Sequence, residues 1–303
     1  MLTKVFEGVG NFFQKVSDDL IPKNKLNEVK TMTLKNKVAV VTGGAGVLCG
    51  AFAKHLADNG AKVAVLDLNL EGAQAVAAQF GGLAVQANVL DKASLEAARE
   101  KVTAELGTCD ILVNGAGGNS PKGTTGTEYL DPDTLDKDGL ASFFDLDQQG
   151  VEFVFNLNFL GTLLPTQAFA RDMIGKTDAS IINISSMSAF TPLTKIPAYS
   201  GAKAAINNFT QWLAVHFSKT GIRVNAIAPG FFISEQNRTL LTNPDGSFTP
   251  RAEKILAATP MGRFGQPDEL LGTLLYLVDS KQSAFVNGVV IPVDGGFSAY
   301  SGV

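Results

Sequence analysis

Short apolar runs alternate with amphipathic segments along most of the chain, beginning at Val38. Apolar runs of strand length between helical segments are typical of parallel strands that helices cover on both faces. The segments between them predict helices that run through about Asn59 and over residues 71–80 and 92–106. The pattern therefore predicts an α/β fold, a doubly wound parallel sheet of about seven strands within residues 35–303. The predicted strands cover residues 38–41, 62–67, 83–85, 110–113, 180–184, 223–227 and 288–293.

The first 34 residues precede this pattern and carry apolar side chains at steps of three and four residues. This spacing predicts an amphipathic helix, followed by a polar linker. Glu7, Lys15, Asp18 and Asp19 interrupt any apolar segment of the kind that a secretory signal needs. The helix would pack on its own domain or on a neighbouring subunit. Binding to a membrane surface is the alternative, which mixed charges on the polar face disfavour.

The composition limits which partners and cofactors are plausible. The chain has 303 residues, of which 45% are hydrophobic and 18% charged, with a net charge of -4. A weakly acidic chain without a basic run is not typical of nucleic-acid or membrane binding. The two cysteines and two histidines form no metal-ligand spacing and no disulfide framework, so we expect no metal and a reducing, cytoplasmic location. No apolar run approaches the roughly 18 residues of a membrane span.

A glycine-rich turn follows the first predicted strand and precedes a helix. Gly43, Gly44 and Gly46 let the backbone approach a pyrophosphate, and the helix N-terminus offers free N–H groups. Asp67 ends the second strand, where a carboxylate can accept hydrogen bonds from the adenosine ribose. No Arg or Lys follows at residues 68–70 to neutralise a 2′-phosphate. These residues predict a dinucleotide site that prefers NAD to NADP.

Tyr199 and Lys203 stand four residues apart on a predicted helix, which places them on one face. A phenol loses its proton near pH 10, about three units too high for work at neutral pH, and each unit costs about 1.4 kcal/mol. An ammonium group about 4 Å away favours the phenolate by about 4 kcal/mol at an intermediate dielectric constant. The pair therefore predicts an acid/base group. A chance Tyr–Lys pair on a surface helix is the alternative, which Ser186 at the end of an apolar strand disfavours.

Together these motifs resemble the short-chain dehydrogenase/reductase family, from Lys37 to the C-terminus. The matching residues follow the family's order along the chain. They lie in turns, at the ends of strands and on helices. They are Thr42-Gly43, Asn114-Gly115-Ala116-Gly117, Asn158, Ser186, Tyr199, Lys203 and Pro229-Gly230.

The resemblance implies a Rossmann-type fold and a role for each matching residue. Tyr199 would be the general acid/base, and Lys203 would lower its pKa and hold the nicotinamide ribose. Ser186 would bond the reacting oxygen, and Asn158 would anchor a water in a proton relay. Asn88 stands where the family usually has an Asp near the adenine. The cofactor contacts so predicted are Gly43, Gly44, Gly46, Val47, Leu48, Asp67, Asn88, Val89, Asn114, Ala116, Gly117, Tyr199, Lys203, Pro229 and Gly230.

Two positions depart from the family pattern. The cofactor turn of the family usually has glycine where this chain has Val47 and Cys49, and Gly46 and Gly50 are displaced by one residue. Cys49 is small enough for close packing of the helix on the strand, so we expect cofactor binding with a shifted loop. Gly115 stands where the family often has a second Asn.

Two segments, 118–145 and 230–260, are candidate substrate loops. The first is longer than is usual in the family, and long loops of this kind are often functional. Asn119 and Lys122 in this loop, Ser188 beyond Ser186, and Arg238 in the second loop are candidate substrate contacts. Arg238 would clamp a carboxylate through two hydrogen bonds. For Lys122 and Arg238, a solvated surface position is an equal alternative.

Residues 42–49, 117–122, 190–195 and 295–303 together resemble one branch of the family, the D-mannonate oxidoreductases, also called fructuronate reductases. This resemblance implies NAD(H)-dependent interconversion of D-mannonate and D-fructuronate by a homotetramer or homodimer. Another sugar-acid or polyol dehydrogenase, such as a gluconate-type enzyme, is the main alternative. A non-catalytic NAD-binding regulator is a second alternative, which the full set of acid/base residues disfavours.

Overall fold

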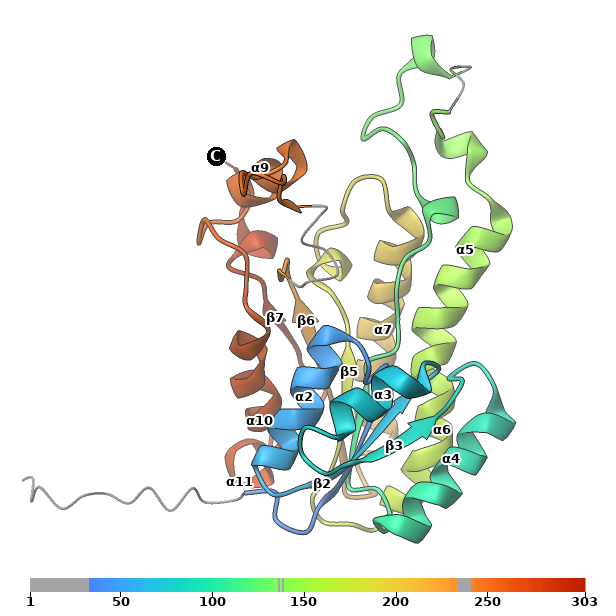
Figure 1. The fold of residues 1–303 in the computed structure, drawn as a ribbon, viewed down its shortest axis with the longest axis vertical. Helices are drawn as coiled ribbons and strands as arrows, with labels where there is room; N and C mark the ends of the chain where they lie inside the picture. The colour runs from blue at the N-terminus through green and yellow to red at the C-terminus, as the bar shows by residue number, and fades with distance from the viewer. Residues whose placement is uncertain (1–32, 136, 138, 234–240, 303) are drawn as a thin grey trace, which may run out of the picture. The chain divides into compact units, whose positions relative to one another are not determined.

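A computed structural model describes residues 33–302, apart from positions 136, 138 and 234–240. The helix predicted within the first 34 residues therefore lies outside the described residues, except for Thr33 and Leu34. Seven parallel strands form one sheet in the order β3-β2-β1-β4-β5-β6-β7 (Figure 1), which confirms the predicted fold class. The strands are β1 (Val38–Thr42), β2 (Lys62–Asp67), β3 (Leu83–Gln86), β4 (Ile111–Asn114), β5 (Ala179–Ile184), β6 (Ile222–Pro229) and β7 (Val290–Val293).

The apolar runs of the sequence became strands because both faces of the sheet are covered. All residues of β1, β4, β5 and β6 are buried. Every predicted strand end lies within two residues of the observed one. The largest differences are at β6, which continues to Pro229, and at β7, which begins after Gly288 in its left-handed conformation (φ 81°).

Helices form a layer on each face of the sheet (Figure 1). On one face, α2 (Val47–Asp58), α3 (Leu70–Ala77) and α10 (Leu271–Val278) bury Phe52, Leu56 and Leu274 in one core cluster. On the other face, α4 (Lys92–Glu105), α6 (Gly161–Met173) and α7 (Pro197–His216) bury Phe169 and Met173 in a second cluster. The predicted doubly wound arrangement is thus present.

The segment between β4 and α5 (Gln148–Phe155) was expected to be a loop and contains three short 3-10 helices. They are η1 (Pro121–Gly123), η2 (Pro132–Thr134) and η3 (Phe143–Asp145), and each begins at a polar side chain that accepts a backbone N–H. These capping side chains belong to Ser120, Asp131 and Ser142. The segment extends beyond the carboxyl edge of the sheet (Figure 1).

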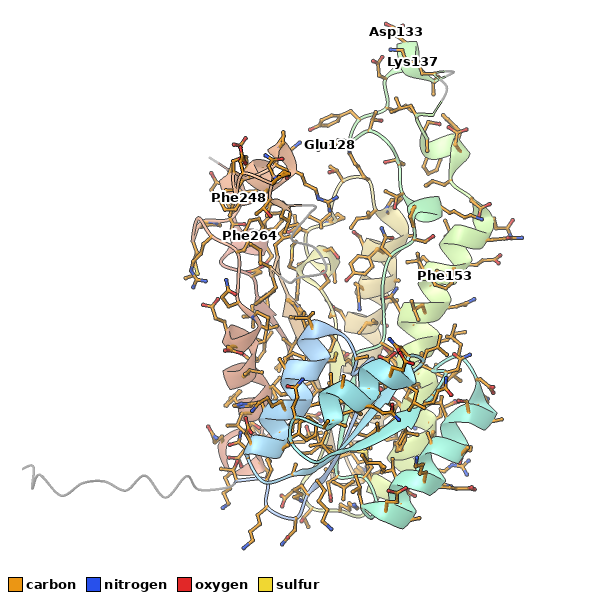
Figure 2. All side chains as sticks on the ribbon, in the orientation of Figure 1. Glu128, Asp133, Lys137, Phe153, Phe248 and Phe264 are labelled. Carbon is orange, nitrogen blue, oxygen red and sulfur yellow. The ribbon has the colours of Figure 1, made fainter. Side chains whose placement is uncertain are left out.

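A second group of elements follows β6 at the same edge. Leu241, Ala252, Ile255 and Phe264 form a small core around α9 (Pro250–Ala257). The rings of Phe248 and Phe264 meet edge to face with centroids 5.8 Å apart (Figure 2). The other short helices of the described residues are η4 (Asn156–Leu160), η5 (Met187–Ala189), η6 (Pro267–Leu270), α11 (Ser280–Ser283) and η7 (Phe297–Ala299).

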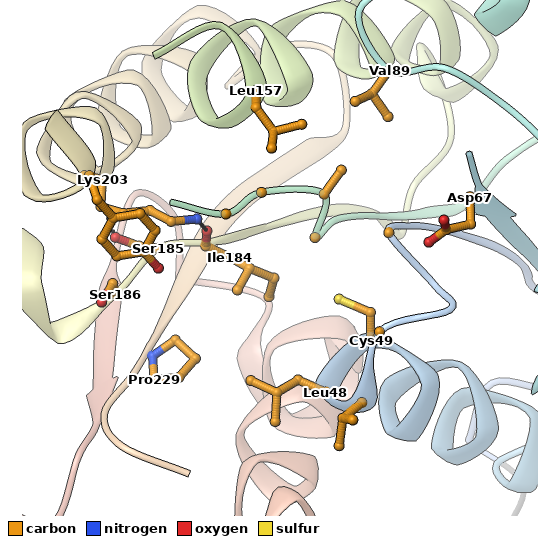
Figure 3. A pocket seen from close by; sticks show the side chains of 18 of the residues that line it. Leu48, Cys49, Asp67, Val89, Leu157, Ile184, Ser185, Ser186, Lys203 and Pro229 are labelled. Atoms are coloured by element: carbon orange, nitrogen blue, oxygen red, sulfur yellow. Dashed lines mark hydrogen bonds between the residues drawn. The ribbon is translucent and has the colours of Figure 1, made fainter. Parts of the chain in front are cut away.

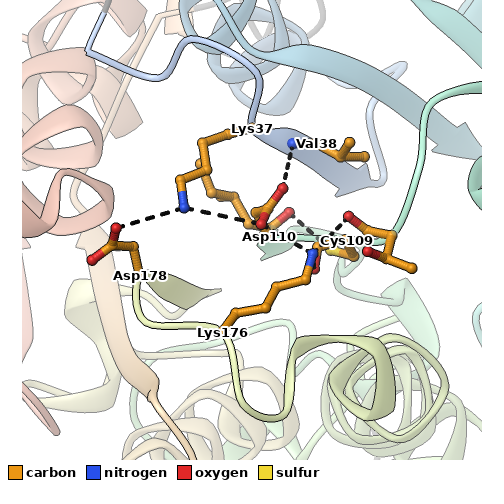
Figure 4. A network of polar contacts seen from close by, with 8 residues as sticks. Lys37, Val38, Cys109, Asp110, Lys176 and Asp178 are labelled. Atoms are coloured by element: carbon orange, nitrogen blue, oxygen red, sulfur yellow. Dashed lines mark hydrogen bonds and ion pairs between the residues drawn. The ribbon is translucent and has the colours of Figure 1, made fainter.

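A charged network joins the amino ends of the central strands (Figure 4). Asp110 accepts hydrogen bonds from the backbone N–H of Val38 at 2.8 Å and from the ammonium of Lys176 at 3.0 Å. The Lys37 ammonium lies 4.0 Å from Asp110 and 3.8 Å from Asp178. The network therefore connects the starts of β1, β4 and β5. Among the described residues, no helix combines the length and apolar composition that crossing a bilayer requires.

Candidate active site

A cavity of about 570 Å³ lies at the carboxyl edge of the sheet, where the loops after β1, β2, β4, β5 and β6 converge (Figure 3). The strand order reverses between β1 and β4 at this edge, and such switch points are where doubly wound sheets bind ligands. Most of the residues predicted to contact a cofactor line this cavity. They are Gly43, Gly46, Val47, Leu48, Asp67, Asn88, Val89, Ala116, Gly117, Tyr199, Lys203, Pro229 and Gly230.

The turn after β1 is shaped by close contacts that only glycine permits. Gly43 adopts a left-handed conformation (φ 64°), and a Cβ there would lie 2.8 Å from the backbone of Ala116. Helix α2 begins at Val47, directly after its N-cap residue Gly46, and no side chain caps its first turn. Its N-terminal N–H groups and dipole therefore face the cavity without an internal anion, an arrangement suited to a phosphate group.

Asp67 stands at the end of β2 beside the same turn. One carboxylate oxygen accepts the N–H of Ala45 at 3.0 Å, and the other accepts the N–H of Asn69 at 2.9 Å. These bonds hold the carboxylate at the rim of the cavity, and each oxygen keeps a lone pair for a further donor. Asn88 lines the cavity nearby, where its side-chain oxygen accepts the N–H of Leu90 at 3.0 Å.

Two predicted cofactor residues do not line the cavity. Gly44 packs beneath the turn, where a Cβ would lie 2.6 Å from a methyl group of Val65. Asn114 is buried in the sheet, and its amide donates to Thr166 and Asn183, both at 2.9 Å. Both residues therefore act on the shape of the site through packing and hydrogen bonds within the protein.

Tyr199, Ser186 and Lys203 meet at the opposite end of the cavity from Asp67. Ser186 follows β5, and the other two lie in the first turns of α7. The Lys203 ammonium is 5.6 Å from the centre of the Tyr199 ring and donates to the carbonyl oxygen of Ile184 at 2.8 Å. The structure thus brings together the three side chains that the sequence pattern singled out.

The electrostatics of this cluster differ from the expectation based on spacing alone. Burial raises the pKa of the Tyr199 phenol above its usual value, and a hydrogen bond with Ser186 opposes that rise. Burial also lowers the pKa of the Lys203 ammonium to about 8. The pKa of the phenol is therefore raised, and not lowered as the spacing alone suggested, because desolvation of the phenol is the largest effect on it.

Asn158 lies in η4, a π-helical turn between α5 and α6, and its side chain is fully buried. Its amide donates to the carbonyl oxygens of Gly118 and Val154, both at 2.7 Å, and its oxygen accepts the N–H of Gly118 at 3.3 Å. Asn158 therefore ties Gly118, at the start of the 118–145 segment, to the helix. π-helical turns are often found at functional sites, but the sequence carries no periodicity that would have predicted this one.

The two departures from the family pattern face each other. The Sγ atom of Cys49 occupies the space that a side chain at Gly115 would need, since a Cβ there would lie 2.1 Å from it. Burial raises the pKa of the Cys49 thiol to about 12, so it is uncharged at neutral pH.

The three candidate substrate residues that the structure describes, Asn119, Lys122 and Ser188, do not line the main cavity. Asn119 is exposed and donates to the hydroxyl of Thr124 at 3.0 Å, and Lys122 is exposed on η1. Ser188 is buried behind Ser186, and its hydroxyl donates to the Ser186 hydroxyl at 3.0 Å. Arg238 lies outside the described residues. In the described part of the chain, no group of three or more His, Cys, Asp or Glu side chains is arranged to hold a metal ion.

Sequence reasoning missed several apolar residues that line the cavity: Leu68, Leu157, Ile184, Phe231 and Phe232. Phe231 and Phe232 directly follow Pro229-Gly230, so their position after the sixth strand was the available signal. Apolar walls of this kind suit the flat faces of aromatic rings.

Comparison with known proteins matches residues 37–245 to the short chain dehydrogenase family model. An uncharacterized oxidoreductase of Haemophilus influenzae is 60% identical over 92% of this chain and 99% of its own length. A D-threitol dehydrogenase of Mycolicibacterium smegmatis is 33% identical over 88% of this chain and 94% of its own length. A crystal structure from Haemophilus influenza, provisionally assigned as a D-mannonate oxidoreductase with bound NAD, aligns with a TM-score of 0.86 and 60% identity. That alignment covers 91% of this chain and all of the other.

Proposed function

Because this chain belongs to the short-chain dehydrogenase family, we propose that it is an NAD(H)-dependent oxidoreductase that interconverts a sugar-acid alcohol and its ketone. D-mannonate and D-fructuronate are the proposed pair. The observation that carries the proposal is the cavity itself, which has an uncapped helix N-terminus and Asp67 at one end and Tyr199, Ser186 and Lys203 at the other. The nicotinamide cofactor accepts or supplies the hydride when it is bound.

The residues of the cavity fit an extended dinucleotide. The Gly43 turn and the start of α2 would hold the pyrophosphate, since a side chain at Gly43 would fill that approach. Asp67 would accept hydrogen bonds from the adenosine ribose, and its charge disfavours a 2′-phosphate there. This supports NAD over NADP. Lys203 would donate to the nicotinamide ribose, because its ammonium lies inside the cavity beside Tyr199.

Proton transfer would fall to Tyr199. In ketone reduction, the phenol gives its proton to the carbonyl oxygen while hydride reaches the carbon, and in alcohol oxidation the phenolate takes that proton back. Ser186 would donate a hydrogen bond to the reacting oxygen. Lys203 has a pKa of about 8, so a large fraction of it is cationic at neutral pH and favours the phenolate once bound ligands complete the site.

The substrate proposal is supported by the relatives. The 60% identical structure is provisionally assigned to D-mannonate, and this chain covers all of it. A second candidate is a neutral polyol, which the similarity to a D-threitol dehydrogenase favours. We further propose a cytoplasmic location and a homo-oligomer, either a tetramer or a dimer. The exposed aromatic face of α7 supports the oligomer.

Turnover of purified protein with NADH and a panel of keto-sugar acids and neutral ketoses tests this function. We expect NADH oxidation with D-fructuronate at a higher kcat/KM than with any neutral ketose. Tyr199→Phe removes the proton donor, and general acids contribute at least about 100-fold, so we expect that loss in kcat with NADH affinity nearly unchanged. Tyr276→Phe is the matched control, since Tyr276 lies in α10 and does not line the cavity. Unchanged turnover in Tyr199→Phe would overturn the mechanism.

A further inference from the structure

Ser188 contacts the active-site serine through two groups. Its backbone N–H donates to the Ser186 hydroxyl oxygen at 3.2 Å, and its own hydroxyl donates to the same atom at 3.0 Å. Ser188 is 1% exposed and does not line the cavity, whereas Ser186 does. The structure therefore places Ser188 behind Ser186, in contact with its hydroxyl and outside the cavity lining.

A hydroxyl group has one proton to donate and two lone pairs with which to accept. The two donors of Ser188 occupy both lone pairs of Ser186. The only hydrogen-bonding capacity left to Ser186 is its proton. Ser186 and Tyr199 line the same cavity, and a hydrogen bond with Ser186 opposes the rise in the pKa of the Tyr199 phenol.

The geometry points to Ser188 as a positioning residue for Ser186. Because Ser188 occupies both lone pairs of the Ser186 hydroxyl, Ser186 donates its proton, toward Tyr199 and toward the reacting oxygen of a bound substrate. This inference rests on the proposed function, because ketone reduction needs Ser186 to donate a hydrogen bond to the reacting oxygen. Without the Ser188 hydroxyl, one lone pair of Ser186 becomes free, and the Tyr199 hydroxyl can donate to it. The hydrogen bond between Ser186 and Tyr199 then reverses.

The reversal has a predictable effect on the phenol. A donor to the phenol oxygen stabilises phenolate, and an acceptor stabilises the neutral phenol. The Lys203 ammonium lies 5.6 Å from the centre of the Tyr199 ring and donates to the carbonyl of Ile184. The Cys49 thiol is uncharged and interacts with Lys203. Neither contacts Ser188, so loss of the Ser188 hydroxyl changes one hydrogen bond to Tyr199 and leaves its charged surroundings in place.

Ser188→Ala in the full-length chain tests this. We expect kcat to fall about tenfold, since one hydrogen bond to a reacting group contributes about that factor, while KM changes much less. In the pH profile of kcat for alcohol oxidation, we expect the limb that reports ionisation of the phenol to move to higher pH. Ser180→Ala is the matched control, because Ser180 is a fully buried serine of β5 whose hydroxyl donates to the carbonyl oxygen of Leu277 at 3.4 Å. We expect this control to keep the wild-type pH profile.

A second measurement does not depend on turnover. The chain has four tyrosines, so 13Cζ-labelled tyrosine gives few resonances, and Tyr199→Phe identifies the one from Tyr199. At neutral pH we expect this resonance to shift in Ser188→Ala and to stay in place in Ser180→Ala. If Ser188→Ala does not fold, Ser188→Cys, a weaker donor of similar size, is expected to give a smaller shift of the same sign.

The outcomes separate the two proposals. An unmoved Tyr199 resonance with a wild-type pH profile would overturn the role of Ser188, even if the protein reduces sugar acids. A moved resonance in a protein that turns over no substrate of the panel would uphold the Ser188 contact and reject the proposed function.

Discussion

Cys49 and Gly115 share one volume between helix α2 and the loop after β4. The thiol fills the position that a side chain at residue 115 would occupy, because a Cβ there would lie 2.1 Å from Sγ. In the family pattern the first of these positions is usually glycine and the second often asparagine. The two departures therefore compensate each other: the larger side chain at residue 49 fills the space left by the smaller residue at 115. This explains how the turn keeps its packing without the usual glycine at residue 49.

We predict that Gly115→Ala destabilises the protein and that Cys49→Ala in the same chain restores part of the loss. The added methyl in Gly115→Ala meets Sγ, and overpacking of this kind costs about 1–3 kcal/mol in unfolding free energy. In the double variant the Cβ of residue 49 would lie 3.5 Å away, an ordinary contact, while the Thr42 carbonyl at 2.9 Å still resists the methyl. Urea denaturation of the four chains of the cycle measures the coupling.

Additive effects of the two substitutions would contradict this shared volume. Gly81→Ala is a control for the general effect of adding a methyl at glycine, since no atom lies within 4 Å of a Cβ there. Its left-handed backbone (φ 71°) adds strain that Cys49→Ala cannot relieve, so its loss of stability is expected to be the same in both backgrounds.

Sequence spacing placed some active-site residues and not others. The helical separation of Tyr199 and Lys203 was sufficient to put both in one cavity, because it is local geometry. The direction of the Tyr199 pKa shift was not predictable, since it depends on burial by distant segments. For the same reason Asn114, expected beside a cofactor, turned instead toward Thr166 and Asn183 inside the sheet.

Among the elements, strands were more predictable than the connections between them. A buried parallel strand is an apolar run whatever it pairs with, so the ends of all seven strands could be predicted closely. The 118–145 segment has no apolar periodicity, and its three 3-10 helices depend on local caps such as Ser142. The π-helical turn at Asn158 depends on contacts with Gly118, forty residues earlier in the chain.

We predict that Asp110→Ala weakens the sheet without affecting the active site. The carboxylate joins the starts of β1 and β4 through Val38 and Lys176, and its loss leaves a part-buried N–H and an ammonium without this acceptor. Such losses cost about 1–3 kcal/mol. Urea denaturation measures the decrease, and kcat at 25 °C is expected to remain unchanged because the network lies at the amino ends of the strands.

Asp58→Ala is the matched control. Asp58 pairs with Lys54 within one turn of α2, and both side chains are more than a third exposed. Exposed pairs of this kind contribute about 0.3–0.5 kcal/mol. Equal losses of stability in Asp110→Ala and Asp58→Ala would show that the network adds no more than a surface ion pair.

At the scale of the whole molecule, helices α6 and α7 present an apolar outer face. Phe209, Trp212 and His216 lie at three and four residue steps on α7, with the Trp212 ring stacked 4.6 Å from His216. A groove of about 460 Å³ between the helices is lined by these rings and by Ile174. Trp212 is 55% exposed, which is unusual for an aromatic side chain within an apolar patch of a single chain.

The sequence indicated this face only through its helical pattern. Apolar positions on a helix that also covers a sheet can be assigned to the core, and Leu213 and Ala214 of α7 are indeed buried there. Trp212 and Val215 have the same hydrophobic character and point outward, which only the placement of the helix on the sheet reveals. A second copy of the chain is the partner we propose, since two such faces would cover each other.

We predict that Trp212→Glu reduces the size of the assembly. A carboxylate on this face would be desolvated against a second copy, so association is expected to weaken by at least about tenfold. Sedimentation velocity over a dilution series tests this: we expect the wild-type chain to sediment as the proposed oligomer and Trp212→Glu as a smaller species. The thermal midpoint is also expected to fall, because α7 carries Tyr199 and Lys203 on its inner side and loses the support of a neighbour. Phe285→Glu is the control, as Phe285 is fully exposed between α11 and β7 and does not line this groove. Dissociation in Phe285→Glu, with Trp212→Glu unchanged, would assign the interface to the surface around Phe285.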